Sequence, residues 1–297
     1  MAGMFDAATV ADPVPLPQSE AFARALDSLS IPCARLDDGT IVLRRRLGRV
    51  PFRMITRPLA GTPQAVLDLA QQAPGKGPMI LSPAKPMPLN HIGALPLVSP
   101  TTIARLDLTQ STDGLMSGLH QKWRNRLRHG QSQNLRITRQ NMPDDPGHWL
   151  LQADRHQQRQ RRYRSWPIAL TLADARAHPG RAKPFTAFWV REPVAALLIL
   201  RHGEDATYQI AHTRPSGRLA SAQTLLMWSA ILWARSKGVQ TLELGLIDTE
   251  EAAGLARFKL GTGAEPVRLG GTWVWWPPLT SMLRPVARFD QNLMGNS

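Results

Sequence analysis

The residues best suited to chemistry lie in one stretch, residues 206–259. A predicted strand at 206–212 leads through Arg214-Pro215-Ser216-Gly217 into a long apolar helix, 219–237, and then into a second strand, 239–246. Two strands joined by a helix with short turns are expected to lie parallel in one sheet. The first N–H groups of a helix have no partner within it, so they bind phosphate readily. The spacing therefore predicts a phosphate or pyrophosphate site where this helix begins.

Several familiar catalytic schemes are excluded by the motifs that the sequence lacks. It contains no G-x-S-x-G, H-E-x-x-H or C-x-x-C pattern and no P-loop. Its single cysteine, Cys33, can form neither an internal disulfide nor a cysteine zinc site. We therefore expect no metal site, and neither a hydrolase of these types nor a nucleoside triphosphatase.

The charge of the chain indicates an anionic partner. The formal net charge is +14, from 36 Lys and Arg against 22 Asp and Glu in 297 residues. This excess favours RNA, a nucleotide cofactor or an acidic membrane surface, and DNA is not expected. The alternative is that arginine serves as a general surface cation without a specific partner. No apolar run is long enough to cross a bilayer and no signal peptide is evident, so we expect a cytoplasmic protein without a transmembrane segment.

The strand pattern predicts an internal duplication. Strands at 185–190, 194–202 and 206–212 are separated by short polar breaks, which is typical of an antiparallel meander. With the helix and the strand that follow, the second half reads β-β-β-α-β. A hairpin at 31–46 around Asp37-Asp38-Gly39, a strand at 50–55, a helix from Thr62 and a strand at 79–81 repeat that order.

We therefore predict an α/β (α+β) fold with mixed sheets and two tandem β-β-β-α-β units joined by a basic helix. The expected boundaries are 1–18 for a mobile N-terminal segment and 19–108 for the first unit. The connecting helix and strand occupy 109–145, and the second unit, 146–297, carries the site. A second basic helix is expected at 148–164.

The second unit resembles the GNAT superfamily, and within it the FemAB-like branch. The similarity rests on a strand with Tyr208, the turn at 214–217, a helix with Trp233-Ala234 followed by Gly238, a strand ending in Gly245, and Phe258-Lys259 before Gly261. It covers roughly the last three-fifths of the chain. The resemblance implies two GNAT-like halves and acyl transfer to an amine. The donor is aminoacyl-tRNA in FemAB-like enzymes proper and acyl-CoA in related branches.

The resemblance also assigns roles to individual residues. Lys259 would stand near the reacting centre and stabilise the oxyanion that forms on the attacked carbonyl. The alternative for Lys259 is a solvated lysine at a helix end. In the pyrophosphate loop Arg214 and Gly217 fit the family pattern, but Leu219 stands where a small residue is usual. The predicted cofactor-binding residues are Arg214, Gly217, Arg218, Ala220 and Ser221.

Two further residues are candidates for proton transfer. Tyr208 can orient the substrate or protonate the leaving group, or it can be a core tyrosine with one hydrogen bond. Glu243 can accept the amine proton, or it can pair with a neighbouring arginine. The predicted substrate-binding residues are Arg124, Arg128, Arg162, His212 and Phe258.

We therefore expect an acyltransferase that forms an amide on a small-molecule or peptide amine. Direct attack is expected because no activated serine or cysteine is evident. Acyl-CoA is the favoured donor, and aminoacyl-tRNA, bound along the basic helices, is the other. The alternative is a non-catalytic module that binds RNA or another anion on a GNAT-like scaffold.

Overall fold

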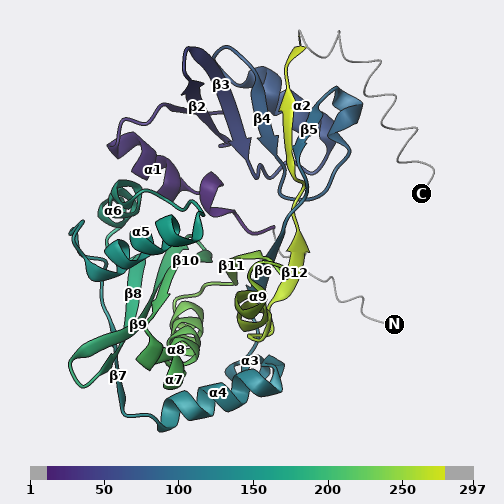
Figure 1. Cartoon of the computed structure of the whole chain (residues 1–297). Coiled ribbons are helices and arrows are strands. Elements are labelled where there is room, and N and C mark those ends of the chain that lie inside the picture. The colour runs from purple at the N-terminus through teal and green to yellow at the C-terminus, as the bar shows by residue number, and fades with distance from the viewer. Residues whose placement is uncertain (1–11, 278–297) are drawn as a thin grey trace, which may run out of the picture.

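The computed structural model describes residues 12–277, which form two mixed sheets with helices around them (Figure 1). The first sheet has six strands in the order β1-β2-β3-β4-β13-β5. They are β1 (Cys33–Arg35), β2 (Ile41–Leu47), β3 (Val50–Thr56), β4 (Met79–Ser82), β5 (Leu95–Val98) and β13 (Thr272–Trp275). The helix α2 (Pro63–Gln72) joins β3 to β4, which are parallel.

The second sheet has seven strands in the order β12-β6-β11-β10-β9-β8-β7. They are β6 (Thr102–Asp107), β7 (Leu135–Arg139), β8 (Ala182–Trp189), β9 (Glu192–His202), β10 (Asp205–Thr213), β11 (Thr241–Ile247) and β12 (Glu265–Arg268). The helix α8 (Ala222–Ser236) joins β10 to β11, which are parallel as expected for a crossover.

The predicted fold class is confirmed, and the two sheets share one plan. In each, three antiparallel strands are followed by a helix and by a strand parallel to the third: β1-β2-β3-α2-β4 and β8-β9-β10-α8-β11. Side chains of β2, β3, β4 and α2 form the first core, and those of β8 to β11 and α8 form the second. The duplication expected from the strand pattern is therefore a repeat of both order and direction.

The two units exchange a strand. β6 lies between β11 and β12 in the second sheet, whereas β13 lies between β4 and β5 in the first. Figure 1 shows the yellow β13 among the blue strands of the first sheet. The expected boundary at residue 108 therefore does not coincide with the division between the sheets, because β6 precedes it and β13 follows the second unit. An alternating pattern indicates that a segment pairs, but it does not identify the partner.

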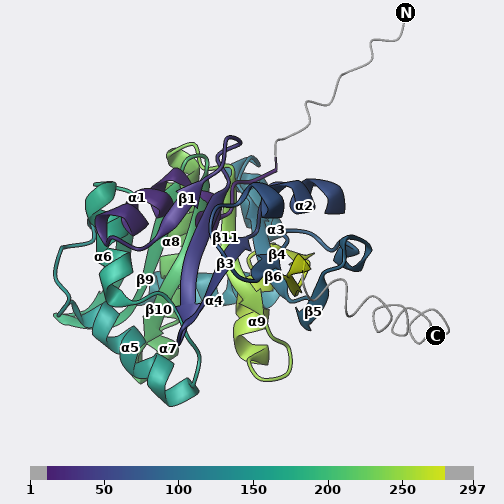
Figure 2. The same cartoon turned by 90° about the horizontal axis from the view of Figure 1, so that it is seen from above.

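The remaining helices cover the faces of the second sheet and the junction. α5 and α6 pack on the face opposite to α8, and α1 lies beside α6 (Figure 2). The two short 3₁₀ turns, η1 and η2, precede α1 and β5. The bounds of these helices and turns are η1 Leu16–Gln18, α1 Glu20–Ser28, η2 Leu89–Ile92, α3 Thr112–Gly118, α4 Gln121–Ser132, α5 Trp149–Arg161, α6 Ile168–Ala177, α7 Pro215–Leu219 and α9 Ala253–Leu260.

Several predicted helices differ from those observed. The helix expected at 219–237 is interrupted: α7 ends at Leu219, and Ser221, with a φ of 51°, precedes α8. The basic helix expected within 109–130 is likewise divided into α3 and α4, and α6 was not predicted at all. The interruption at Ser221 has a local cause, because a left-handed residue cannot continue a right-handed helix.

Residues 12–18, expected to be part of a mobile segment, contact both units instead. The backbone N–H of Val14 donates to Asp205 Oδ2 at 2.8 Å, and the side-chain amide of Gln18 donates to the Thr56 carbonyl at 2.7 Å. Leu16 is buried between these contacts. The rest of the predicted segment, residues 1–11, lies outside the described residues. Among the helices described, none is both long and apolar enough to span a membrane.

Candidate functional site

The candidate site lies where two parallel strands of the second sheet separate. Within the described residues, β10 and β11 pair only from Asp205 to Thr207 and from Thr241 to Glu243. Both strands then become irregular, β10 after Tyr208 and β11 after Glu243. β10 continues to Thr213 and β11 to Ile247 without pairing to each other. Beyond this point β10 stays paired to β9 and β11 to β6, and the edges that the two strands turn toward each other are no longer joined.

Lys259 is buried beside the point where the two strands separate. α9 carries it against β11, where its Nζ donates to the Leu246 carbonyl at 2.7 Å, and the side chain is 6% exposed. Burial lowers the pKa of Lys259 to about 8, and the Glu243 carboxylate acts in the opposite direction. The alternative of a solvated helix-end lysine is wrong. A buried ammonium with a lowered pKa is typical of functional sites.

Glu243 is paired with an arginine from the other sheet. Arg57 donates from Nη1 and Nη2 to the two carboxylate oxygens at 2.8 and 2.7 Å. The side chains are only 10% and 17% exposed. Arg57 follows β3 and has a φ of 56°, a left-handed conformation that is unusual for a residue other than glycine. The role of Glu243 as proton acceptor stays a prediction, and this pairing favours a structural role at the junction.

Tyr208 belongs to a hydrogen-bonded chain between β10 and α8. The side-chain amide of Gln223 donates to Tyr208 Oη at 3.2 Å, and Gln223 Oε1 accepts from Thr213 Oγ1 at 3.0 Å. Burial raises the pKa of Tyr208, so its hydroxyl is protonated at neutral pH. The phenol is therefore in the protonation state that a proton donor requires, and its orientation is fixed by Gln223.

His212 and Arg214 extend this site towards α5. The His212 ring meets Trp149 edge-on at 6.2 Å, and the Arg214 guanidinium lies 5.9 Å from the Trp149 ring. Burial, followed by the cations Arg214 and Arg218, lowers the pKa of His212, which is therefore neutral at physiological pH. Its Nδ1 is buried and has no hydrogen-bond partner among the described residues. This buried nitrogen thus leaves one hydrogen-bonding capacity of the ring unused within the described residues.

The predicted phosphate loop is held close to the sheet by Gly217. A Cβ at this position would lie 2.3 Å from the Val194 carbonyl of β9, so only glycine fits. Ala220 is buried, whereas Leu219 is 78% exposed and its bulk points away from the core. Arg218 and Ser221 complete the predicted set, and Ser221 Oγ lies 3.2 Å from His129 Nδ1. The break between α7 and α8 thus lies between the end of α7 and the first turn of α8.

The remaining predicted residues, Phe258 and three arginines, form no side-chain hydrogen bond or ion pair with Lys259, Tyr208 or Glu243 within the described residues. Phe258 packs on Trp123, with ring centroids 6.2 Å apart, and its carbonyl accepts from the Trp123 indole at 3.1 Å. This contact fastens α9 to α4. Arg124 and Arg128 lie on α4, and Arg162, at the end of α5, is exposed with a φ of 55°. Their roles in binding stay predictions.

Sequence reasoning missed three residues that shape the site. Arg57 comes from the first unit, Gln223 is the second residue of α8, and Trp149 begins α5. None carries a local motif, because each acts through a contact with a distant part of the chain. Within residues 12–277, no group of three or more His, Cys, Asp or Glu side chains is arranged to hold a metal ion.

The comparisons with known proteins agree with this geometry. Residues 118–260 match the family of the acetyltransferase (GNAT) domain. This segment contains α4, the separating strands, α8 and α9. This segment is therefore a GNAT-type domain, as its resemblance indicated. A comparison with curated proteins finds no match.

Among solved structures, FemX shares its fold with most of this chain. FemX superimposes with a TM-score of 0.71 at 11% identity over 92% of this chain and 94% of its own. L-PGS from Bacillus licheniformis gives a TM-score of 0.54 at 15% identity, covering 92% and 96% of the two chains. At these identities the likeness concerns the fold.

Proposed function

We propose that the chain is an acyltransferase that moves an acyl or aminoacyl group from acyl-CoA or an aminoacyl-tRNA onto an amine. The observation that carries the proposal is the buried ammonium of Lys259 beside the separated ends of β10 and β11. This lies within the segment that matches the GNAT domain. The fold shared with FemX and L-PGS supports acyl or aminoacyl transfer in general.

In the proposed reaction, the amine nitrogen attacks the donor carbonyl, the C–N bond forms and the C–S or C–O bond to the carrier breaks. A protonated Lys259 has three N–H groups, of which one donates to the Leu246 carbonyl, and another would stabilise the oxyanion. Tyr208 would donate a proton to the departing thiolate or ribose oxygen. The amine loses its proton to a base, for which Glu243 and His212 are the candidates.

The turn from Arg214 to Ser221 fits the diphosphate of a CoA donor. Arg214 precedes α7 and Arg218 lies in its last turn, so both supply positive charge close to the start of α8, and the side chain of Leu219 is exposed. When bound, CoA would supply an activated thioester. The protein's own part is to hold the diphosphate at the turn and to orient the carbonyl towards Lys259.

The test is a mass-spectrometric assay for amide products from acetyl-CoA and, separately, from charged tRNA, with a panel of primary amines. We expect product from one donor, and a loss of about 10²-fold or more in Lys259→Ala, the size of removing one oxyanion donor. Lys237→Ala, which removes an exposed lysine at the end of α8, serves as the control. An inert wild-type protein with both donors, or an active Lys259→Ala, would contradict the proposal.

A second candidate is a non-catalytic RNA-binding module, favoured by α4. This helix carries Lys122, Arg124, Arg126 and Arg128, and none forms an ion pair within the described residues. RNA binding that falls steeply with salt and is lost in Arg124→Glu/Arg128→Glu, in a protein inert with every donor, would favour this function.

A further inference from the structure

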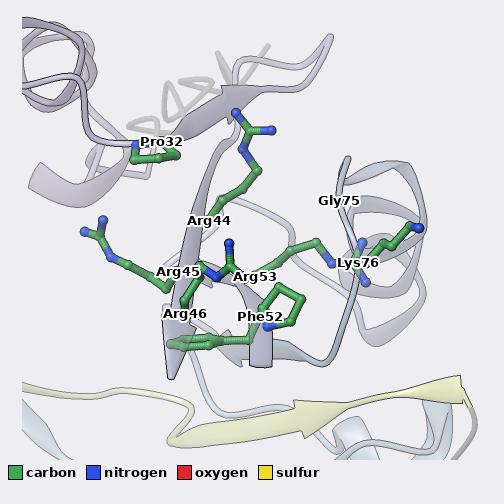
Figure 3. Close-up of a pocket in the computed structure, with 9 residues that line it drawn as sticks. Pro32, Arg44, Arg45, Arg46, Phe52, Arg53, Gly75 and Lys76 are labelled. Atoms are coloured by element: carbon green, nitrogen blue, oxygen red, sulfur yellow. The ribbon is translucent and has the colours of Figure 1, made fainter. Parts of the chain in front are cut away.

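A basic cavity of about 600 Å³ lies in the first unit and shares no residue with the candidate active site (Figure 3). Its lining includes the side chains of Arg44, Arg45, Arg46, Arg53 and Lys76 and contains no acidic residue. Its volume is within the range of small-ligand sites, but so concentrated a positive charge is unusual in an apolar pocket. The cavity is therefore suited to an anion.

The antiparallel register of β2 and β3 builds this cavity. Arg44 lies opposite Arg53 in the ladder, and Arg46 follows Arg44 on the same face because side chains alternate along a strand. Val42, further along that face, is buried in the core with α2. Along this face of β2, the residues packed under α2 are thus apolar, and the residues beyond α2 are cationic.

The cations of the cavity have different roles. Arg53 is buried and caps the end of α2, donating to the carbonyls of Ala73 at 2.6 Å and Gly77 at 3.2 Å. In contrast, Arg44, Arg45, Arg46 and Lys76 form no ion pair within residues 12–277. Arg53 therefore forms the floor of the cavity, while Arg44, Arg46 and Lys76 are available for a ligand.

The tip of the same hairpin is apolar and exposed. Leu47 and Val50 face each other across the ladder and are 78% and 56% exposed. Arg49 lies in the turn between them. A site for a soluble phosphate compound would need only the cations. An exposed apolar pair directly beside them is instead the combination found on surfaces that bind anionic membranes.

We propose that the β2–β3 hairpin docks onto an anionic lipid surface. The phosphate of a lipid headgroup enters the cavity between Arg44, Arg46 and Lys76, while Leu47 and Val50 enter the boundary of the acyl chains. Nucleic acid would meet the same cations but would leave the apolar pair in water. The proposal is independent of the reaction at Lys259.

The experiment is co-sedimentation of the full chain with phosphatidylcholine vesicles, with or without phosphatidylglycerol. We expect binding only when phosphatidylglycerol is present, and weaker binding as salt rises. Arg44→Glu/Arg46→Glu should reduce the partition coefficient by more than about tenfold, since each cation near an anionic surface contributes roughly fivefold. Leu47→Ser/Val50→Ser should reduce it by about tenfold through the loss of apolar burial. Circular dichroism melts establish that each variant is folded.

Two matched controls come from the second unit. Arg191→Glu/Arg268→Glu makes the same change of charge at exposed positions away from the hairpin. Val190→Ser removes an equally exposed apolar residue, 79% exposed, from the tip between β8 and β9. Both should bind phosphatidylglycerol vesicles like the wild type.

Three outcomes of the vesicle experiment would overturn the proposal. They are equal binding to both kinds of vesicle, wild-type binding by the folded Arg44→Glu/Arg46→Glu variant, and equal losses in the charge control. Binding of a random-sequence RNA that depends on Arg44 and Arg46, without binding to vesicles, would also reject the lipid and assign the cavity to nucleic acid. Inorganic diphosphate that binds with the same dependence, again without vesicle binding, would assign it to a soluble anion.

Discussion

At the scale of single residues, the molecule is unusual in burying a lysine where its charge is expensive. Moving an ammonium out of water disfavours the charged form, and burial is the main cause of the lowered pKa of Lys259. Its hydrogen bond to the Leu246 carbonyl offsets only part of that cost. A lysine held in this way is neither a surface cation nor a simple core residue, which is why it is our first candidate for catalysis.

The pKa of Lys259 predicts how the proposed activity depends on pH. The pKa is lowered to about 8, so the ammonium is present below that pH and lost above it. If the charge stabilises the oxyanion, kcat/KM should fall as the pH rises through about 8. A pH–rate profile of the free enzyme measures this. A profile that continues to rise through pH 10 would show that the ammonium is not required.

At the scale of elements, the turn before α8 depends on a glycine that allows close packing. A Cβ on Gly217 would lie 2.3 Å from the Val194 carbonyl, a backbone atom that cannot rotate away. Gly217→Ala should therefore lower the free energy of unfolding by about 1–3 kcal/mol, as overpacked sites do. Urea denaturation measures the change.

Gly254→Ala provides the matched control for this prediction. Gly254 lies in the first turn of α9, and a Cβ there meets nothing within 4 Å. Because alanine favours a helix more than glycine does, this variant should be as stable as the wild type or up to about 1 kcal/mol more stable. Equal destabilisation by both substitutions would contradict the packing argument.

Another element, α6, contains a buried carboxyl group. Asp174 is 3% exposed, its Oδ1 has no hydrogen-bond partner among the described residues, and burial raises its pKa to about 6, opposed by Arg181. Since the folded-state pKa is above the unfolded value, the cost of ionisation appears as the pH rises from about 4 and is complete above about 6.

Asp174→Asn removes that cost. At pH 7 we expect the free energy of unfolding to increase by about 1–3 kcal/mol, in line with a rise of roughly two pKa units. At pH 4 the variant and the wild type should differ little, because the carboxyl group is then protonated in the folded protein. Thermal melts at both pH values check this, and an increase of the same size at pH 4 would rule out ionisation as the cause.

At the scale of the whole molecule, the exchanged strands and one ion pair join the two units. β6 and β13 each complete the other unit's sheet, and Arg57 reaches from the first sheet to Glu243 in the second. Glu243 is the last residue of β11 that pairs with β10. The pair therefore links the first unit to the edge of the candidate site.

Breaking this pair should be costly because it leaves a charge buried. Arg57→Met or Glu243→Gln alone should lower the free energy of unfolding by about 3–5 kcal/mol, and the double variant should lose less than the sum. A double-mutant cycle in urea measures the coupling. The exposed pair Arg176 and Asp144, 2.9 Å apart, is the control and should couple by at most about 1 kcal/mol. Similar coupling in the two cycles would contradict the argument.

The sequence by itself determined the repeated β-β-β-α-β order and the crossover from β10 to β11, and it marked Lys259 and Gly217 as candidate site residues. These features depend on residues close in the chain: turn residues, alternation along strands, and a motif that occupies one segment. The same local reading placed Tyr208 on a central strand, where the structure has it.

Only the tertiary structure decided the exchange of β6 and β13, the pairing of Glu243 with Arg57, and the meeting of His212 with Trp149. The physical reason is that each depends on which distant segment lies alongside, and hydrophobic pattern and turn chemistry do not encode that choice. The burial of Lys259 belongs to the same class. Its position in the chain marks it as a candidate, but only the packing of α9 on β11 removes it from water and lowers its pKa.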